Sequence, residues 1–295
     1  MRHLLRTQFL VIATVVGVAW TPMLSIAADS QPLTMIVMDP LAAPLSCPCV
    51  KGYAQRKYEE LGKYLEQELG RPVRIEFSES LGKALDKTDR HADLVIGKRS
   101  VVAAQSKQHK VPLSAVLALS GKDGQTTQTG LVVVPASDPA RTVADLKGYR
   151  IIFGPADCDE KHNAAIALLK KHGVTAAEKI ETCAACSDGA TTILEAGPDS
   201  RAATVISSYA APLLEGCGTI EKGDLRVIGT TEPVPFIAAF ISTALPESDQ
   251  AAITAALKEV GEEPVLLGAI ESKSGFVPED NAVVAETSPA AKKKN

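Results

Sequence analysis

The sequence predicts an α/β fold in which mostly parallel strands are covered by helices on both faces. Strand-like apolar runs alternate with helical stretches along the chain, which is typical of parallel strands joined by helical crossovers. The 295 residues are 45% hydrophobic and 22% charged, as in an ordinary globular chain. Eighteen Pro and 21 Gly are near average usage, so collagen-like and Pro/Gly-rich disordered classes are excluded.

The predicted elements follow one another in a regular order. The first long helix is indicated by Tyr58, Leu61, Leu65 and Leu69, which recur three and four residues apart, and by Gly70, which ends it. Strands are predicted over residues 33–37, 73–77, 93–97, 113–119, 131–134, 150–153, 226–228 and 236–240. Helices are predicted over residues 54–69, 81–85, 159–172 and 249–260, with a helical turn over 143–146. Residues 180–214 continue the alternation, and residues 281–295 are predicted to be a disordered tail.

The N-terminal segment, residues 1–27, predicts a cleaved signal peptide. Arg2 and Arg6 give it a positive start, residues 9–20 form an apolar run, and the end at Ala27 fits the small-x-small rule of signal peptidase. The apolar run is well short of the ~20 residues that span a bilayer. We therefore expect a soluble, exported protein.

The charge balance excludes one class of partner. Lys and Arg number 31 against 35 Asp and Glu, and no basic run occurs before residues 292–294. A nucleic-acid binder needs concentrated positive charge, so none is expected here. The aromatic content of 4% also argues against stacking of sugars or bases on rings.

Several segments resemble a known family. They are YEELGKYLE and LGRPV at residues 58–66 and 69–73, ADLVIG at 92–97, VADLKGYRIIFG at 143–154, and the stretches 225–235 and 245–247. These segments resemble the phosphonate/phosphite-type periplasmic solute-binding proteins of ABC transporters. The resemblance implies the two-lobed type II periplasmic binding protein fold, with a mostly parallel sheet in each lobe.

The resemblance also implies the organisation and partners of the chain. The first lobe would hold residues 28–125 and 224–280, and the second lobe residues 126–223, with crossings near 126–131 and 223–234. Such a protein is not an enzyme and needs no cofactor. It closes as a monomer on a small polar solute, a phosphate- or phosphonate-like oxyanion, and delivers it to a membrane permease. Some relatives instead serve a periplasmic quinoprotein partner as accessory proteins.

Ligand residues are implied at the loops that follow the strands. Where the family carries a Ser-Thr-Ser-Gly-like segment after Phe153, this chain has residues 157–163, whose three carboxylates would repel a phosphonate. Asp157 and Glu160 are also spaced as a helix capping box, Ser187 and Ser207 could be N-caps, and a lone helical lysine is mostly solvated. The candidate ligand residues are Ser100, Thr127, Thr129, Cys158, Lys161, His162, Ser187, Asp188 and Tyr209.

Six cysteines leave further alternatives open. In an exported chain they are disulfide candidates, with 15 possible pairings. Cys158 and His162 are four residues apart, so they would share one helix face and suit a soft metal. With Cys47 and Cys49 they give the alternative of a copper or zinc site. A thiol–disulfide enzyme ranks last. The six are Cys47, Cys49, Cys158, Cys183, Cys186 and Cys217.

Overall fold

The computed structural model describes residues 31–46 and 55–279, which belong to one compact unit. The predicted signal peptide, Cys47, Cys49 and the predicted tail lie outside the described residues. None of the helices within the described ranges combines the length and apolar character needed to cross a membrane.

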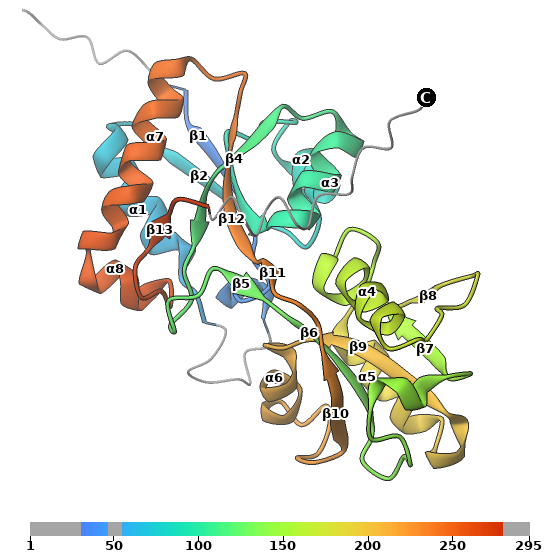
Figure 1. Cartoon of the computed structure of the whole chain (residues 1–295). Coiled ribbons are helices and arrows are strands. Elements are labelled where there is room, and N and C mark those ends of the chain that lie inside the picture. The colour runs from blue at the N-terminus through green and yellow to red at the C-terminus, as the bar shows by residue number, and fades with distance from the viewer. Residues whose placement is uncertain (1–30, 47–54, 280–295) are drawn as a thin grey trace, which may run out of the picture. The chain divides into compact units, whose positions relative to one another are not determined.

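The first lobe is built on a six-stranded sheet (Figure 1). Helices α1 (Tyr58–Leu69), α7 (Glu247–Glu259) and α8 (Pro264–Ala269) bury apolar side chains against one face. Helices α2 (Leu81–Lys87) and α3 (Arg99–His109) cover the other face. The strands in order across the sheet are β13 (Phe276–Val277), β4 (Leu113–Leu119), β12 (Ile237–Ser242), β3 (Leu94–Lys98), β1 (Leu33–Met38) and β2 (Val73–Phe77).

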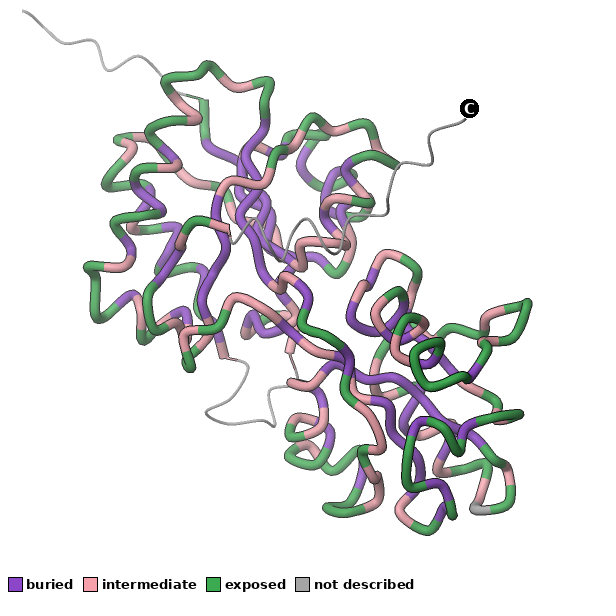
Figure 2. The backbone as a smooth tube through the Cα atoms, in the orientation of Figure 1, coloured by how far each residue is buried: buried purple, intermediate pink, exposed green. Residues whose placement is uncertain are grey.

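The second lobe is built on a five-stranded sheet. Helix α4 (Asn163–Lys171) packs on one face, and helices α5 (Cys186–Glu195) and α6 (Ala210–Gly216) pack on the other. The strands in order are β10 (Leu225–Thr230), β6 (Gly130–Pro135), β9 (Ala202–Ser207), β7 (Arg150–Phe153) and β8 (Glu181–Thr182). Short 3₁₀ turns are η1 (Ala43–Leu45), η2 (Val143–Leu146), η3 (Asp159–Lys161), η4 (Pro198–Ser200) and η5 (Val260–Glu262). The strands β1, β12 and β9 are buried along their whole length (Figure 2).

Two short strands connect the lobes. β5 (Thr127–Gln128) and β11 (Val234–Pro235) pair antiparallel, and we call this pair the hinge ribbon. We predicted the second crossing near residues 223–234, with the first lobe resuming at residue 224. β10 nevertheless pairs with β6 across residues 225–230, so the return to the first lobe follows β10. The sheet that β10 joins is decided by its pairing with β6. The residues of β10 alone do not indicate this partner.

The predicted α/β class is confirmed, and the sheets are mixed. β1 runs parallel to β2 and β3, and β7 runs parallel to β8 and β9. β12 runs antiparallel to β3 and β4, because it enters the first lobe from the hinge ribbon. The carboxyl ends of β1, β3 and β4 consequently lie at one edge of the sheet, which faces the hinge ribbon.

A buried ion pair fixes the loop that follows β1. Asp39 is fully buried and accepts hydrogen bonds from Arg56 Nη1 at 2.7 Å and from the Tyr58 hydroxyl at 2.5 Å. The Leu41 N–H donates to the second Asp39 oxygen at 2.9 Å. Arg56 and Tyr58 stand at the start of α1, so the pair ties this helix to the edge of the sheet.

Candidate functional site

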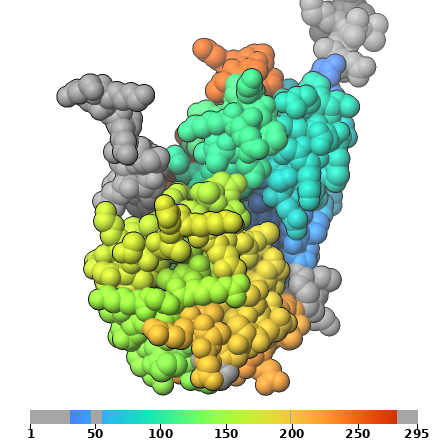
Figure 3. All heavy atoms as spheres, turned by 90° about the vertical axis from the view of Figure 1, so that its right-hand side faces the viewer, coloured from blue at the N-terminus to red at the C-terminus, as the bar shows by residue number. Residues whose placement is uncertain are grey.

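A polar cluster joins the two lobes at the ends of their strands. Lys98 ends β3 in the first lobe, Ser207 ends β9 in the second, and Glu160 lies in η3 beyond β7. Lys98 Nζ donates to the Glu160 carboxylate and lies 3.3 Å from both Ser207 Oγ and Cys158 Sγ. Strand ends in α/β sheets are the usual place for ligand groups. In the space-filling view, atoms of the first lobe (teal) and of the second lobe (yellow-green) are in contact on the face shown (Figure 3).

Donors nearly enclose the Glu160 carboxylate. Its side chain is 3% exposed, and that of Lys98 is 11% exposed. Ser207 Oγ donates to Glu160 Oε1 at 2.7 Å, and Cys158 Sγ donates to Oε2 at 3.3 Å. Burial by itself would raise the pKa of Glu160, but the Lys98 charge and the hydrogen bonds from Lys98 and Ser207 lower it to about 2. The carboxylate is therefore ionised at neutral pH.

Tyr209 and Cys158 complete the cluster as neutral groups. Lys98 Nζ lies 5.3 Å from the centroid of the Tyr209 ring, within the range of cation–π attraction. Burial raises the pKa of the Tyr209 hydroxyl even though the nearby Lys98 opposes this. Burial likewise raises the pKa of Cys158 to about 12, so this thiol stays protonated at neutral pH.

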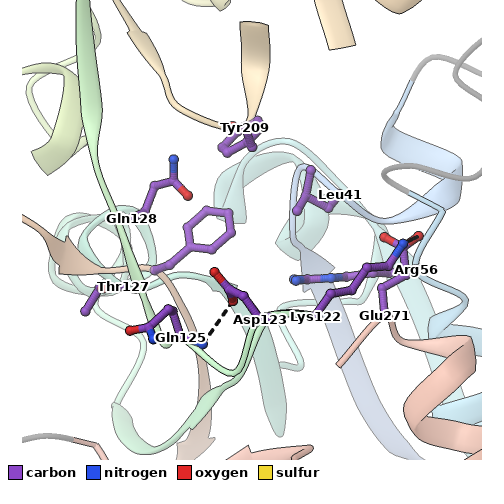
Figure 4. A pocket seen from close by; sticks show the side chains of 11 residues that line it. Leu41, Arg56, Lys122, Asp123, Gln125, Thr127, Gln128, Tyr209 and Glu271 are labelled. Carbon is purple, nitrogen blue, oxygen red and sulfur yellow. Dashed lines mark hydrogen bonds and ion pairs between the residues drawn. The ribbon is translucent and has the colours of Figure 1, made fainter. Parts of the chain in front are cut away.

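A pocket of about 270 Å³ beside the hinge ribbon shares Tyr209 with the cluster (Figure 4). Arg56 lines another side of it, and Arg56 Nε has no hydrogen-bond partner among the described residues. The rings of Tyr209 and Phe236 lie with their centroids 5.5 Å apart. The pocket is lined by Leu41, Arg56, Gly121, Lys122, Asp123, Gln125, Thr127, Gln128, Tyr209, Phe236 and Glu271. It thus combines aromatic rings with charged groups of both signs.

Four of the predicted ligand residues lie in the polar cluster, beside it or in the pocket. Cys158 and Tyr209 belong to the polar cluster, and Thr127 lines the pocket. Ser100 lies next to the cluster, where its Oγ accepts a hydrogen bond from the backbone N–H of Asp159 at 3.2 Å. These residues come from both lobes and from the hinge ribbon.

Three other predicted ligand residues make contacts away from the Glu160 carboxylate. His162 Nδ1 lies 2.9 Å from the carbonyl oxygen of Gly154. Lys161 packs so closely on Gly154 that a Cβ at that glycine would lie 2.5 Å from Lys161 Cβ. Lys161 is buried, which corrects the interpretation of a solvated helical lysine. Thr129 follows β5, and its carbonyl oxygen accepts the backbone N–H of Ser208 at 3.0 Å.

The predicted capping box of Asp157 and Glu160 does not form. Gln105 Nε2 donates to Asp157 at 3.0 Å, and Glu160 belongs to the cluster. The predicted helix over 159–172 is divided into η3 and α4, because His162 adopts φ −122° and ψ −81° between them. Cys158 and His162 therefore do not share the face of one α-helix.

The two predicted serine N-caps are also wrong. Ser187 is the second residue of α5, and the residue before the helix is Ala185. Asp188 accepts the Ala185 N–H at 3.2 Å, which satisfies this helix start. Ser207 ends β9 and directs its hydroxyl to Glu160. Ser187 and Asp188 thus stand at the first turn of α5.

Lys98 and Arg56 are site residues that were not among the predicted candidates. Lys98 directly follows the apolar strand predicted over 93–97, and that position was a usable signal. Arg56 lies within a predicted helix, where an arginine is ordinarily exposed. Its burial depends on Asp39, which is 17 residues away.

The described cysteines are free thiols. Cys158 is buried, and Cys183, Cys186 and Cys217 are partly exposed. Within residues 31–46 and 55–279, no group of three or more His, Cys, Asp or Glu side chains is arranged to hold a metal ion. Cys47 and Cys49, which the copper or zinc alternative requires, lie outside these residues.

One family model matches most of the chain. The model of the periplasmic substrate-binding protein of phosphonate ABC transporters matches residues 52–284. No curated protein sequence matches the chain.

Solved structures share the fold at low sequence identity. A Xanthomonas citri protein bound to ATP is 14% identical, with a TM-score of 0.65, over 88% of this chain and 96% of that one. A binding component of an ABC phosphonate transporter from Pseudomonas aeruginosa is 12% identical, with a TM-score of 0.63, over 87% and 84%. PhnD1 from Prochlorococcus marinus in complex with methylphosphonate is 11% identical, with a TM-score of 0.62, over 87% and 97%.

Proposed function

The chain belongs to the periplasmic substrate-binding proteins of phosphonate ABC transporters, and we propose that it captures a small oxyanion between its lobes. The oxyanion is of the phosphonate, phosphate or sulfonate type, and an ABC permease receives it. Proteins of this family bind solutes and are not enzymes.

The proposal rests on one observation: the polar cluster already binds an anionic group, the Glu160 side chain. A carboxylate, that of Glu160, accepts hydrogen bonds from Lys98 Nζ, Ser207 Oγ and Cys158 Sγ. An ammonium and a hydroxyl aimed at one negative group are also the donors that a phosphonate or sulfonate oxygen requires. We infer that the ligand takes these donors when Glu160 turns away.

The position of Lys98 connects binding to motion of the lobes. Lys98 is supplied by the first lobe, whereas Ser207 and Glu160 are supplied by the second. An oxyanion that binds Lys98 and Ser207 together would hold the lobes closed, and its loss would allow opening at the hinge ribbon.

Calorimetric titration of the protein from Ala28 onward tests the proposal. Methylphosphonate, phosphate and ethanesulfonate are the probes. We expect at least one of them to bind the wild-type protein. Binding should be lost in Lys98→Met, because the Lys98 ammonium is the only charged donor on the Glu160 carboxylate among residues 31–46 and 55–279. Glu160→Gln should bind more tightly, because it removes the competing negative charge.

Lys171→Met is the matched control. Lys171 is 67% exposed and pairs only with the exposed Glu232 among the described residues, so its loss should leave binding unchanged. Circular dichroism establishes that each variant is folded. Absence of heat with all three anions in both wild type and Glu160→Gln would refute the proposal, as would wild-type affinity in Lys98→Met.

A further inference from the structure

We propose that Cys183 and Cys186 form a reversible intramolecular disulfide at the start of α5. This redox site is independent of the oxyanion proposal. Its reaction partners are small disulfides in the oxidising direction and thiols in the reducing direction. Disulfides form and persist in the periplasm, because it is an oxidising compartment.

Cys183 and Cys186 both lie at the start of α5. Cys186 is the first residue of the helix, and Gly189 is three residues further on, so the two share a face. A Cβ at Gly189 would lie 3.0 Å from Cys183 Sγ. The Cys183 side chain therefore folds back over the first helical turn, toward the face that carries Cys186.

Backbone contacts hold both cysteines against the sheet. The Cys183 N–H donates to the carbonyl oxygen of Phe153 at 2.9 Å, and Cys183 Sγ lies 3.6 Å from the same oxygen. The backbone N–H of Ser207 donates to Cys186 Sγ at 3.4 Å. Both side chains pack in one apolar cluster. These contacts place both cysteines beside the start of α5, in the apolar cluster between this helix and the sheet.

The other described thiols are less suited to react. Cys158 is 4% exposed, and its thiol is held by Glu160 and Lys98. Cys217 donates to the carbonyl oxygen of Leu213 at 2.8 Å. Cys183 and Cys186 are partly exposed, as is Cys217, so a small disulfide can reach them, and each of the two has a second cysteine three residues away.

The reaction is an exchange in two steps. One cysteine loses its proton, and its thiolate attacks a sulfur of the small disulfide RSSR, which forms a mixed disulfide and releases RS⁻. The second cysteine then loses its proton and attacks the protein sulfur of the mixed disulfide, which releases a second RS⁻. The two released thiolates take up the two protons. Two protein thiols are oxidised and RSSR is reduced to two RSH.

The site adjoins the polar cluster through one residue. Ser207 contacts Cys186 through its backbone N–H and contacts Glu160 through its hydroxyl. A disulfide here would also fix the first turn of α5, which carries Ser187 and Asp188. Oxidation of Cys183 and Cys186 would therefore act on Ser207, whose hydroxyl donates to the Glu160 carboxylate.

Peptide mapping with oxidised glutathione tests the proposal. Trypsin releases residues 180–201 as one peptide that contains Cys183 and Cys186, while Cys158 falls in the peptide 151–161. After oxidation, alkylation and digestion, we expect the peptide 180–201 to be unalkylated and two hydrogen atoms lighter than its reduced form. Treatment with dithiothreitol before alkylation should restore two alkylated cysteines.

Single variants separate closure from simple modification. In Cys183→Ser or Cys186→Ser, the remaining cysteine should stop at the mixed disulfide and carry glutathione. Cys217→Ser is the matched control and should keep the disulfide. Alkylation of both cysteines in the oxidised wild-type protein would overturn the proposal. So would a glutathione adduct that does not close, or a cross-link from this peptide to another one.

Discussion

The ion pair between Lys98 and Glu160 is predicted to couple strongly in a double-mutant cycle. Its environment lowers the pKa of Glu160 from 4.5 to about 2. Since one pKa unit corresponds to about 1.4 kcal/mol, the folded state favours the carboxylate by roughly 3 kcal/mol. Breaking a buried pair by removing one partner typically costs about 3–5 kcal/mol. Each of Lys98→Met and Glu160→Gln should therefore lower the free energy of unfolding by about 3 kcal/mol.

The assay is urea unfolding at pH 7 of the wild type, both single variants and the double variant. The double variant should lose much less than the sum of the single losses, because neither charge is then left buried alone. Lys171 and Glu232, which are 67% and 84% exposed, provide a control pair whose coupling should stay below about 0.5 kcal/mol. A coupling free energy below about 0.5 kcal/mol between Lys98 and Glu160 would refute the prediction.

The same pair predicts a pH dependence with a defined sign. The pKa of Glu160 is lower in the folded protein than in the unfolded chain, so the contribution is complete above about pH 4.5. It is lost progressively as the pH falls toward about 2. The difference in free energy of unfolding between wild type and Glu160→Gln should shrink over this window. A difference that stays constant from pH 6 to about pH 3 would contradict the assignment.

Three further outcomes are expected. Gly130→Ala should cost about 1–3 kcal/mol in urea unfolding, because its Cβ would lie 2.0 Å from the carbonyl oxygen of Glu160; unchanged stability would contradict this close approach. Asp39→Asn should cost about 3–5 kcal/mol, because it leaves Arg56 buried without its counter-ion; a loss below 1 kcal/mol would count against the pair. Cys158 should resist iodoacetamide at pH 8 in the folded protein, because burial raises its pKa to about 12, and rapid alkylation by mass spectrometry would show otherwise.

The elements of the fold were predictable because their signals are local. The spacing of Leu61 and Leu65 predicts α1, and both side chains are fully buried in the structure. The direction of β12 was not predictable in this way. Its residues are apolar and would suit a parallel or an antiparallel strand equally well. The path of the chain through the hinge ribbon decides between the two.

The sequence indicated that site residues follow the strand ends, but it did not indicate which side chains pair there. Ser100 and Cys158, two candidates that follow predicted strands, lie next to the polar cluster and within it. Local rules then assigned Glu160 to a capping box with Asp157, whereas its partner Lys98 is 62 residues away in the sequence. Burial decides this choice, because a carboxylate that is 3% exposed needs a cation more than it needs a backbone donor.

The position of β12 has a consequence for the order in which an exported chain can fold. β12 lies between β4 and β3, so the first lobe cannot complete its sheet until residue 242 has emerged. The strands of the second lobe, by contrast, form one continuous stretch from residue 130 to residue 230. All strands of the second lobe have therefore emerged while the first lobe still lacks β12, which lies between β4 and β3. We expect the second lobe to fold first during translocation, and the arrival of β12 to be the late, long-range step that commits the first.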